Sequence, residues 1–194
     1  MKKAKLLTTL AAVALIGAIG VGSTFAYLSS KTETVVNTFT VGNVVITLDE
    51  KDTDGSTADA ERDTANAYTD MIPGNSYEKD PTVHVSANSE NCYVFVKVTG
   101  LDANKDALVI NAFNTNLVKV DGSNNNDGIY RYNAVVTKSA SVQDIVVFNG
   151  FTLKSDVKGG TTITNITVEA CAVQADNLNE TTALTEAKAA ANWN

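Results

Sequence analysis

One segment, Cys92-Tyr93-Val94-Phe95-Val96-Lys97-Val98, decides the fold class. Cysteine and valine occupy its even-numbered positions, and Tyr, Phe and Lys occupy the positions between them. Such alternation is typical of a β-strand whose two faces meet different surroundings. A second segment, 162–173, alternates in the same way, with a more apolar side formed by Thr164, Ile166, Val168 and Ala170. Both segments are therefore predicted to be strands, and the second is predicted to be half-buried.

Similar short runs recur through the rest of the chain, separated by clusters of Gly, Asn and Asp. The further predicted strands are 35–41, 44–48, 82–86, 108–111, 117–120, 129–137, 145–148 and 150–154. Many short strands with turn residues between them indicate a sandwich or a barrel. We predict an all-β fold, a jelly-roll-like β-sandwich over residues 42–194.

Three stretches depart from this pattern. Residues 49–70 are acidic and poor in apolar side chains, which favours a mobile loop with a helical turn near 58–67. The turn residues of 121–128 predict a hairpin tip between two of the strands. Near the end, a short helix is expected over Glu180–Ala191, capped by Asn179 or Thr181. Trp193 follows this helix and is expected to dock on the domain.

The first 26 residues have the order of a secretory signal. Three lysines precede an apolar run over 6–21, and small residues, Thr24 and Ala26, precede the expected cut. Cleavage after Ala26 by a signal peptidase would start the mature chain at Tyr27. The alternative is an uncleaved membrane anchor. Glycines interrupt the run, however, and it is short against the roughly 20 residues of a spanning helix. We predict a signal-peptide helix that is removed and a secreted protein with no membrane segment after cleavage.

The charge balance excludes nucleic acid as an expected partner. The whole chain has 15 Lys+Arg against 22 Asp+Glu. Lys2, Lys3 and Lys5 leave with the signal segment, so 12 basic residues face 22 acidic ones and the net charge becomes −10. Phosphate binding depends on clustered Lys and Arg, whereas an acidic surface suits a solvated extracellular protein.

The residues that usually carry catalysis are scarce. His84 is the only histidine, whereas catalytic zinc commonly uses several. Valines flank it on both sides, so we interpret it as a strand residue. The sequence Asp52-Thr53-Asp54-Gly55 begins like a calcium loop, but position 12 is Asp63 where a Glu is needed. We predict no enzyme, no metal and no cofactor, and a solvated acidic loop at 52–55.

The two cysteines, Cys92 and Cys171, both lie in predicted strands. Export permits a disulfide between them. The alternative is two buried thiols that act as small hydrophobic side chains.

Several motifs together resemble the TasA/camelysin family of exported bacterial proteins. The sequence TFAYLS at 24–29 matches the family's cleavage region, and NTFTVG at 37–42 matches the strand that follows it. The sequence IPGNSY at 72–77 resembles a third family segment, with Asn75 in place of the common Asp. The resemblance covers about residues 1–100.

The resemblance implies a jelly-roll sandwich that polymerises into extracellular matrix fibres, alone or with other matrix proteins. In such fibres each subunit donates its mature N-terminal segment as a strand to the next subunit. That segment corresponds here to residues 27–41, and its expected assembly residues are Tyr27, Leu28, Val35, Val36 and Phe39. The alternative is that 27–34 frays or folds back on its own domain.

Three functional hypotheses follow. The first is a structural subunit or accessory of a matrix fibre, located in the extracellular matrix or at the cell surface. The second is a jelly-roll module that binds a glycan or a surface protein through loops 49–70 and 121–128, with Tyr68 and Tyr77 for sugar stacking. The third is a camelysin-type metallopeptidase, which the single histidine disfavours.

Overall fold

The computed structural model describes residues 42–56, 61–122 and 126–193. The chain divides into two compact units, Met1–Thr40 and Val41–Asn194, and the described residues all belong to the second. The signal segment 1–26 and the donor-like segment 27–41 lie outside the described residues. So do their individual site residues, which are Ala26, Tyr27, Leu28, Val35, Val36 and Phe39.

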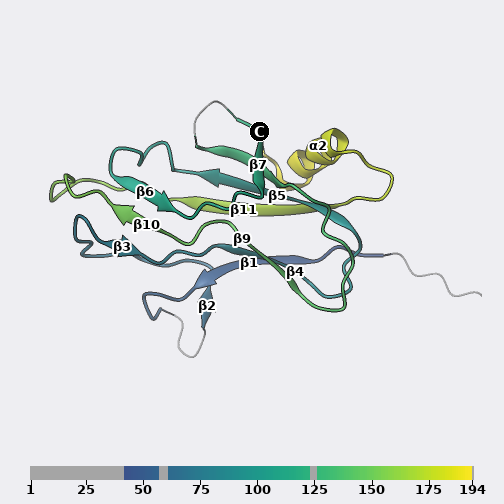
Figure 1. Ribbon diagram of the computed structural model, residues 1–194, viewed down its shortest axis with the longest axis horizontal. Coiled ribbons are helices and arrows are strands. Elements are labelled where there is room, and N and C mark those ends of the chain that lie inside the picture. Colours follow the sequence, from purple (N-terminus) through teal and green to yellow (C-terminus); the bar gives the residue numbers. More distant parts are fainter. Residues whose placement is uncertain (1–41, 57–60, 123–125, 194) are drawn as a thin grey trace, which may run out of the picture. The chain divides into compact units, whose positions relative to one another are not determined.

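Strands dominate the described residues, and one helix ends them (Figure 1). In chain order the elements are β1 (Ile46–Lys51), β2 (Arg62–Asp63), β3 (Ser76–Tyr77), β4 (Thr82–Val85), β5 (Cys92–Thr99), β6 (Leu108–Asn111), β7 (Leu117–Asp121), β8 (Gly128–Tyr132), β9 (Gln143–Val146), β10 (Gly150–Leu153), β11 (Thr167–Gln174) and α2 (Glu180–Ala191). The predicted fold class, an all-β sandwich with a short C-terminal helix, is confirmed.

All the strand pairs are antiparallel. One sheet has the order β2-β1-β4-β9, a second has β3-β10-β6, and a third has β11-β5-β8-β7. β4 pairs with β9, and β3 pairs with β10. In the chain β3 comes directly before β4, and β10 comes directly after β9. The three-stranded sheet therefore continues the line of the first sheet.

The pairing is nested along the chain. β5 pairs with β8, and β4 pairs with β9, so the outer pair encloses the inner one. Nested antiparallel pairs divided between two sheets characterise the jelly-roll class of sandwich. Two further pairs lie outside this nested order: β1 pairs with β4, and β7 pairs with β8.

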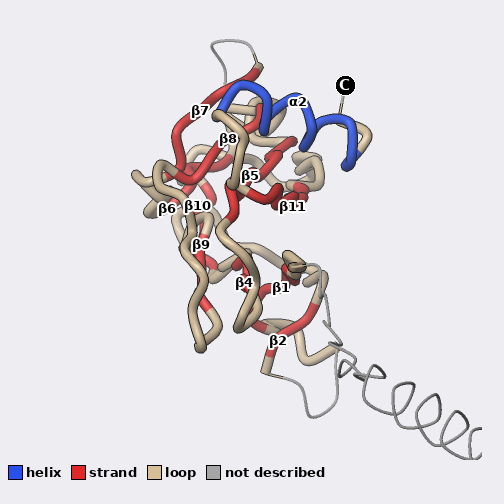
Figure 2. The backbone as a smooth tube through the Cα atoms, turned by 90° about the vertical axis from the view of Figure 1, so that its right-hand side faces the viewer, coloured by secondary structure: helices blue, strands red, loops and turns tan. Residues whose placement is uncertain are grey.

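The main core lies between the sheet β2-β1-β4-β9 and the sheet β11-β5-β8-β7. Its buried side chains include Val83, Val85, Cys92, Val94, Val96, Val98, Leu117, Tyr130, Ile145, Val147 and Phe148. A second cluster fills the other face of β5, where Phe95 packs with Ala183, Ala187 and Trp193. Helix α2 therefore covers the face of β5 and β11 that points away from β1 and β4 (Figure 2).

The alternation in the sequence correctly assigns the faces of both long strands. The even positions of β5 enter the main core, and Phe95 enters the cluster under α2. The second strand begins at Thr167, five residues later than predicted, and Val168 and Ala170 pack against the main core, as does Ile166 just before the strand. The helix has the predicted bounds, and of the two candidate caps the structure selects Asn179, whose side chain accepts from Thr182 N.

Two local predictions were wrong. Residues 49–51 belong to β1, and Arg62 and Asp63 form β2, so the acidic stretch carries strand structure rather than a helical turn over its described residues. The predicted strand 129–137 ends at Tyr132, and Val136 makes only an isolated bridge to Cys92. The hairpin expected around 121–128 is formed by β7 and β8.

The disulfide that export permits is not formed, because both cysteines are free thiols. Cys92 points into the main core, whereas Cys171 packs on the opposite face of the sheet with the cluster under α2. Burial raises the pKa of the Cys92 thiol to about 11 and also raises that of Cys171. Both thiols therefore behave as small apolar side chains.

Candidate functional site

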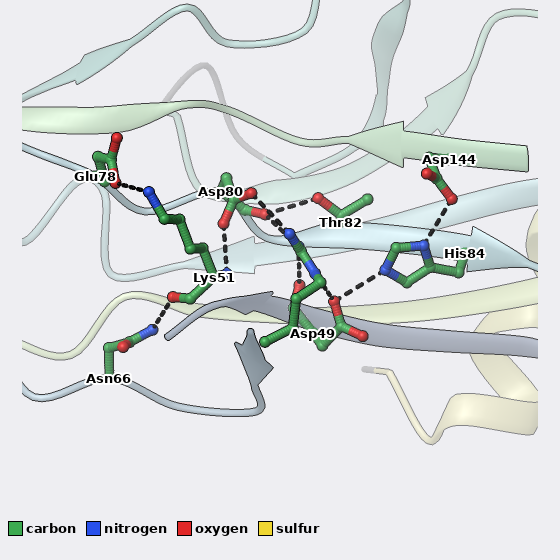
Figure 3. A network of polar contacts seen from close by, with 9 residues as sticks. Asp49, Lys51, Asn66, Glu78, Asp80, Thr82, His84 and Asp144 are labelled. Atoms are coloured by element: carbon green, nitrogen blue, oxygen red, sulfur yellow. Dashed lines mark hydrogen bonds and ion pairs between the residues drawn. The ribbon is translucent and has the colours of Figure 1, made fainter. Parts of the chain in front are cut away.

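A polar network covers the outer face of the sheet β2-β1-β4-β9 (Figure 3). Its position follows from the period of two along a strand. Because Val83 and Val85 enter the core, His84 between them must face outward. Asp144 lies directly across from His84 in β9, and Asp49 lies on the neighbouring strand β1.

His84 bridges the two strands that flank it. Its Nδ1 lies 2.6 Å from Asp144 Oδ1, and its Nε2 lies 2.9 Å from Asp49 Oδ1. The His84 side chain is 19% exposed, and the side chains of Asp49 and Asp144 are 28% and 58% exposed. One imidazole thus connects β1, β4 and β9.

Arg62 extends the network to β2. Its Nε donates to Asp49, its Nη1 donates to Asp80 Oδ2 at 3.0 Å, and its Nη2 donates to the main-chain oxygens of both aspartates. β2 pairs with β1 through two residues only. The guanidinium therefore supplies much of the attachment of this short edge strand.

The electrostatics of the network favour the charged forms of Asp49, Arg62 and His84. Burial alone would raise the pKa of Asp49, but hydrogen bonds from Arg62 and His84 lower it below the ordinary value. Burial alone would lower the pKa of His84, but its hydrogen bonds to Asp49 and Asp144 raise it. The two carboxylates on either side of the ring thus stabilise its protonated form.

A second ion pair joins Glu50 of β1 to Lys79, which lies between β3 and β4. Lys79 Nζ donates to Glu50 Oε2 at 2.6 Å, and both side chains are largely removed from solvent. Lys51 and Glu78 form a pair of the same length nearby, but both of those side chains are mostly exposed.

The contrast between these pairs gives a testable prediction. The substitution Lys79→Ala leaves the buried Glu50 without its cation and is expected to lower the free energy of unfolding by about 1–3 kcal/mol. The matched control Lys51→Ala removes an exposed pair and should cost much less. Urea unfolding measures both values. Equal losses of unfolding free energy in the two variants would show that burial of the Glu50–Lys79 pair adds nothing to stability.

A groove of about 600 Å³ lies beside Glu50 and Lys79. Its lining combines residues 48–50 of β1, residues 64–68 and the segment 163–168 that leads into β11. Apolar groups contributed from elsewhere include Met71, Leu108 and Phe151. We call it the β1–β11 groove.

Thr167 and Val168, the first residues of the long strand β11, line this groove. Among the described strands, β11 pairs with β5 only, and the register runs over eight residues from Thr167 to Gln174. β11 and β1 approach each other without pairing. An unpaired strand edge offers main-chain N–H and C=O groups to an added strand.

The aromatic residues proposed for sugar stacking are used within the fold. The Tyr77 ring stacks on Phe151 at 5.5 Å, and the Tyr68 ring meets Phe151 edge-on at 5.1 Å. The Tyr68 hydroxyl donates to Glu78 O, and burial raises the pKa of Tyr68 to about 12. The Tyr68 ring lines the groove together with Phe151, and the Tyr77 ring packs behind Phe151.

The carboxylates of the two predicted binding loops accept hydrogen bonds from main-chain N–H groups of the protein itself. Asp127 accepts from the main-chain N–H groups of Gly100, Leu101 and Asp102, and Asp102 accepts in return from Asp127 N. In the other loop, Asp52 Oδ1 accepts from Asp54 N and Gly55 N. Among the described residues, no group of three His, Cys, Asp or Glu side chains is arranged to hold a metal ion.

Sequence reasoning placed His84 on a strand but missed its partners. The valines on either side of it are the signal that it faces outward, and that signal is local. Asp49 and Asp144 are 35 and 60 residues away, and only the register of three strands brings them to the imidazole.

Comparison with known proteins returns no match to a family model, to a curated protein or to a solved structure. Over the part of the chain that the structure describes, no helix is long and apolar enough to span a bilayer. The fold class rests on the strand pairing described above.

Proposed function

We propose that this chain is a secreted structural protein, a subunit or accessory of an extracellular matrix fibre, and not an enzyme. The observation that carries the proposal is the edge of β11, which pairs with no second described strand and whose first residues line the β1–β11 groove. The N-terminal residues 27–41 supply a segment of suitable pattern, and the resemblance to TasA-like proteins points to the same use.

The donor segment suits addition to a sheet edge. Its last part alternates, with Val35, Phe39 and Val41 on one side, interrupted by Asn37, and Val36 and two threonines on the other. An extended peptide that adds to an edge gains affinity from main-chain hydrogen bonds, and side-chain pockets set its register. The groove would take the apolar side of the donor.

The length of the segment is sufficient for this role. At about 3.3 Å per residue, 15 extended residues reach roughly 50 Å, against about 26 Å for the eight residues of β11. A donor could pair along most of that edge and still leave chain to connect two copies. Because donation of this kind is head-to-tail and does not close, repeated donation produces a filament.

The proposal places the chain in the extracellular matrix or at the cell surface after removal of residues 1–26. Its main partner is a second copy of itself, and other matrix proteins are further candidates. A signal peptidase is the processing partner.

A peptide titration tests the acceptor side. A labelled peptide of residues 27–41 is expected to bind saturably to the processed chain that lacks residues 27–36, as measured by fluorescence anisotropy. The matched control peptide carries Asp in place of Val35, Val36 and Phe39 and should bind at least about tenfold more weakly, since it cannot fill an apolar groove. Equal binding by both peptides would contradict strand donation.

A further inference from the structure

The sheet beside the groove contains a single imidazole with a carboxylate on each ring nitrogen. His84 Nδ1 meets Asp144 Oδ1 at 2.6 Å and Nε2 meets Asp49 Oδ1 at 2.9 Å. An ionised carboxylate can only accept hydrogen bonds, and a neutral imidazole carries one N–H. Both contacts are hydrogen bonds only when the ring carries two protons.

We propose that protonated His84 is a clasp that ties β1 and β9 to β4, and that loss of its proton opens the tie to β9. The clasp acts within the sheet β2-β1-β4-β9 and does not depend on assembly. Any effect on assembly rests additionally on the proposed function, because β1 forms one wall of the β1–β11 groove.

The different surroundings of Asp49 and Asp144 determine which of the two hydrogen bonds to His84 is lost. Asp49 is anchored a second time by Arg62 Nε and is 28% exposed, whereas Asp144 is 58% exposed. When one proton leaves, the remaining N–H is best kept at Nε2 toward the anchored Asp49. The lone pair on Nδ1 then faces Asp144, whose exposed carboxylate turns to solvent.

The other charged groups of the site support this order of events. Arg62 comes from β2, Asp80 lies just before β4, and the carboxylates of β1 and β9 face the ring from either side. With His84 protonated, two cations oppose three carboxylates. With His84 neutral, the arginine alone opposes them, so the cluster gains negative charge as the pH rises.

The direction of the pH effect follows from linkage. His84 has its pKa raised in the folded protein above the ordinary 6.5. Its stabilising contribution is therefore fully present below about pH 6.5 and is lost as the pH rises through the folded value. Because Asp144 is largely exposed, we expect the unfolding equilibrium constant to rise only about two- to fivefold through this group.

Proton NMR of the full chain in its processed, untagged form tests the clasp directly, because His84 is the only histidine and gives one Cε1–H signal. We expect a titration midpoint above 6.5 in the wild type and a lower midpoint in Asp144→Asn, whose amide can donate to a neutral ring. The exposed control Asp156→Asn should leave the midpoint within about 0.2 units, since it has no contact with the ring.

Urea unfolding at about pH 6 and about pH 9 is the second measurement, with His84→Gln as the comparison. Between these pH values the unfolding equilibrium constant should rise about two- to fivefold in the wild type through this group, and this rise should be absent from His84→Gln. If His84→Gln fails to fold, the reduced pH dependence of Asp144→Asn provides the same test. A wild-type midpoint at or below 6.5, or one unchanged in Asp144→Asn, would overturn the proposal. Neither measurement depends on filament formation, so a failure of the clasp is distinguishable from a failure of the proposed function.

Discussion

Removal of residues 27–36 is expected to abolish filament formation and to leave the β-sandwich folded. The hydrophobic clusters of the described residues are formed by side chains that follow this segment, and we expect them to hold the fold without it. The deleted chain would keep an acceptor edge but would have no strand to donate. Sedimentation at rising protein concentration measures the loss of polymer, and circular dichroism measures the retained fold.

A matched pair of point variants separates strand pairing from mere length. Val36→Pro removes a main-chain N–H from the middle of the donor segment and should reduce polymer nearly as much as the deletion does. Ser29→Ala changes a small polar side chain near the start and should leave assembly within about twofold, since it keeps every main-chain N–H of the donor segment. Polymer formed at the wild-type level by the deleted chain would refute donation by this segment.

Phe95→Ala is expected to lower the free energy of unfolding by about 3–5 kcal/mol, the range measured for large-to-small substitutions at buried aromatic sites. Phe95 is fully buried and forms the floor on which α2 packs. Removing its ring leaves a cavity against Ala183, Ala187 and Trp193. Urea unfolding of the full chain gives the value, and near-ultraviolet circular dichroism of the single tryptophan reports the loosened helix.

Val118→Ala is the control for that substitution. Val118 lies on the edge strand β7 and is 47% exposed, so its truncation should cost less than about 1 kcal/mol. If Phe95→Ala lowered the free energy of unfolding as little as Val118→Ala does, the cluster under α2 would not be a cooperative part of the fold.

The elements with a strong local pattern could be predicted from the sequence. Strand β5 and helix α2 are the clearest cases, because alternation, a capping residue and an apolar stripe are properties of consecutive residues. The burial of Trp193 follows for the same reason, since a large aromatic side chain just after a helix needs a surface to pack on.

Strands β2 and β3 could not be predicted, because each has only two residues. They exist through their neighbours, β1 in one case and β10 in the other. The predicted strand 129–137 also ends early: Asn133 N donates to Asn116 O in the register of the β7–β8 ladder, and beyond it only Val136 forms a bridge, to Cys92.

The candidate site was the least predictable part of the molecule. The His84 network depends on the register of three strands, and the β1–β11 groove depends on segments more than 100 residues apart. Residue types alone suggested a solvated acidic loop at 52–55. The structure adds that Asp52 and Asp54 accept main-chain N–H groups, and Asp54 has its pKa lowered chiefly by the hydrogen bond from Ala67 N.

Electron microscopy of the purified, processed chain tests the central claim of self-assembly most directly. Samples concentrated at about pH 5 and at about pH 7 compare two levels of repulsion, because protonation of carboxylates reduces the −10 charge of the chain after residue 26. The account predicts uniform filaments of one subunit width, more abundant at the lower pH. Monomers alone at both pH values, at every concentration reached, would contradict it.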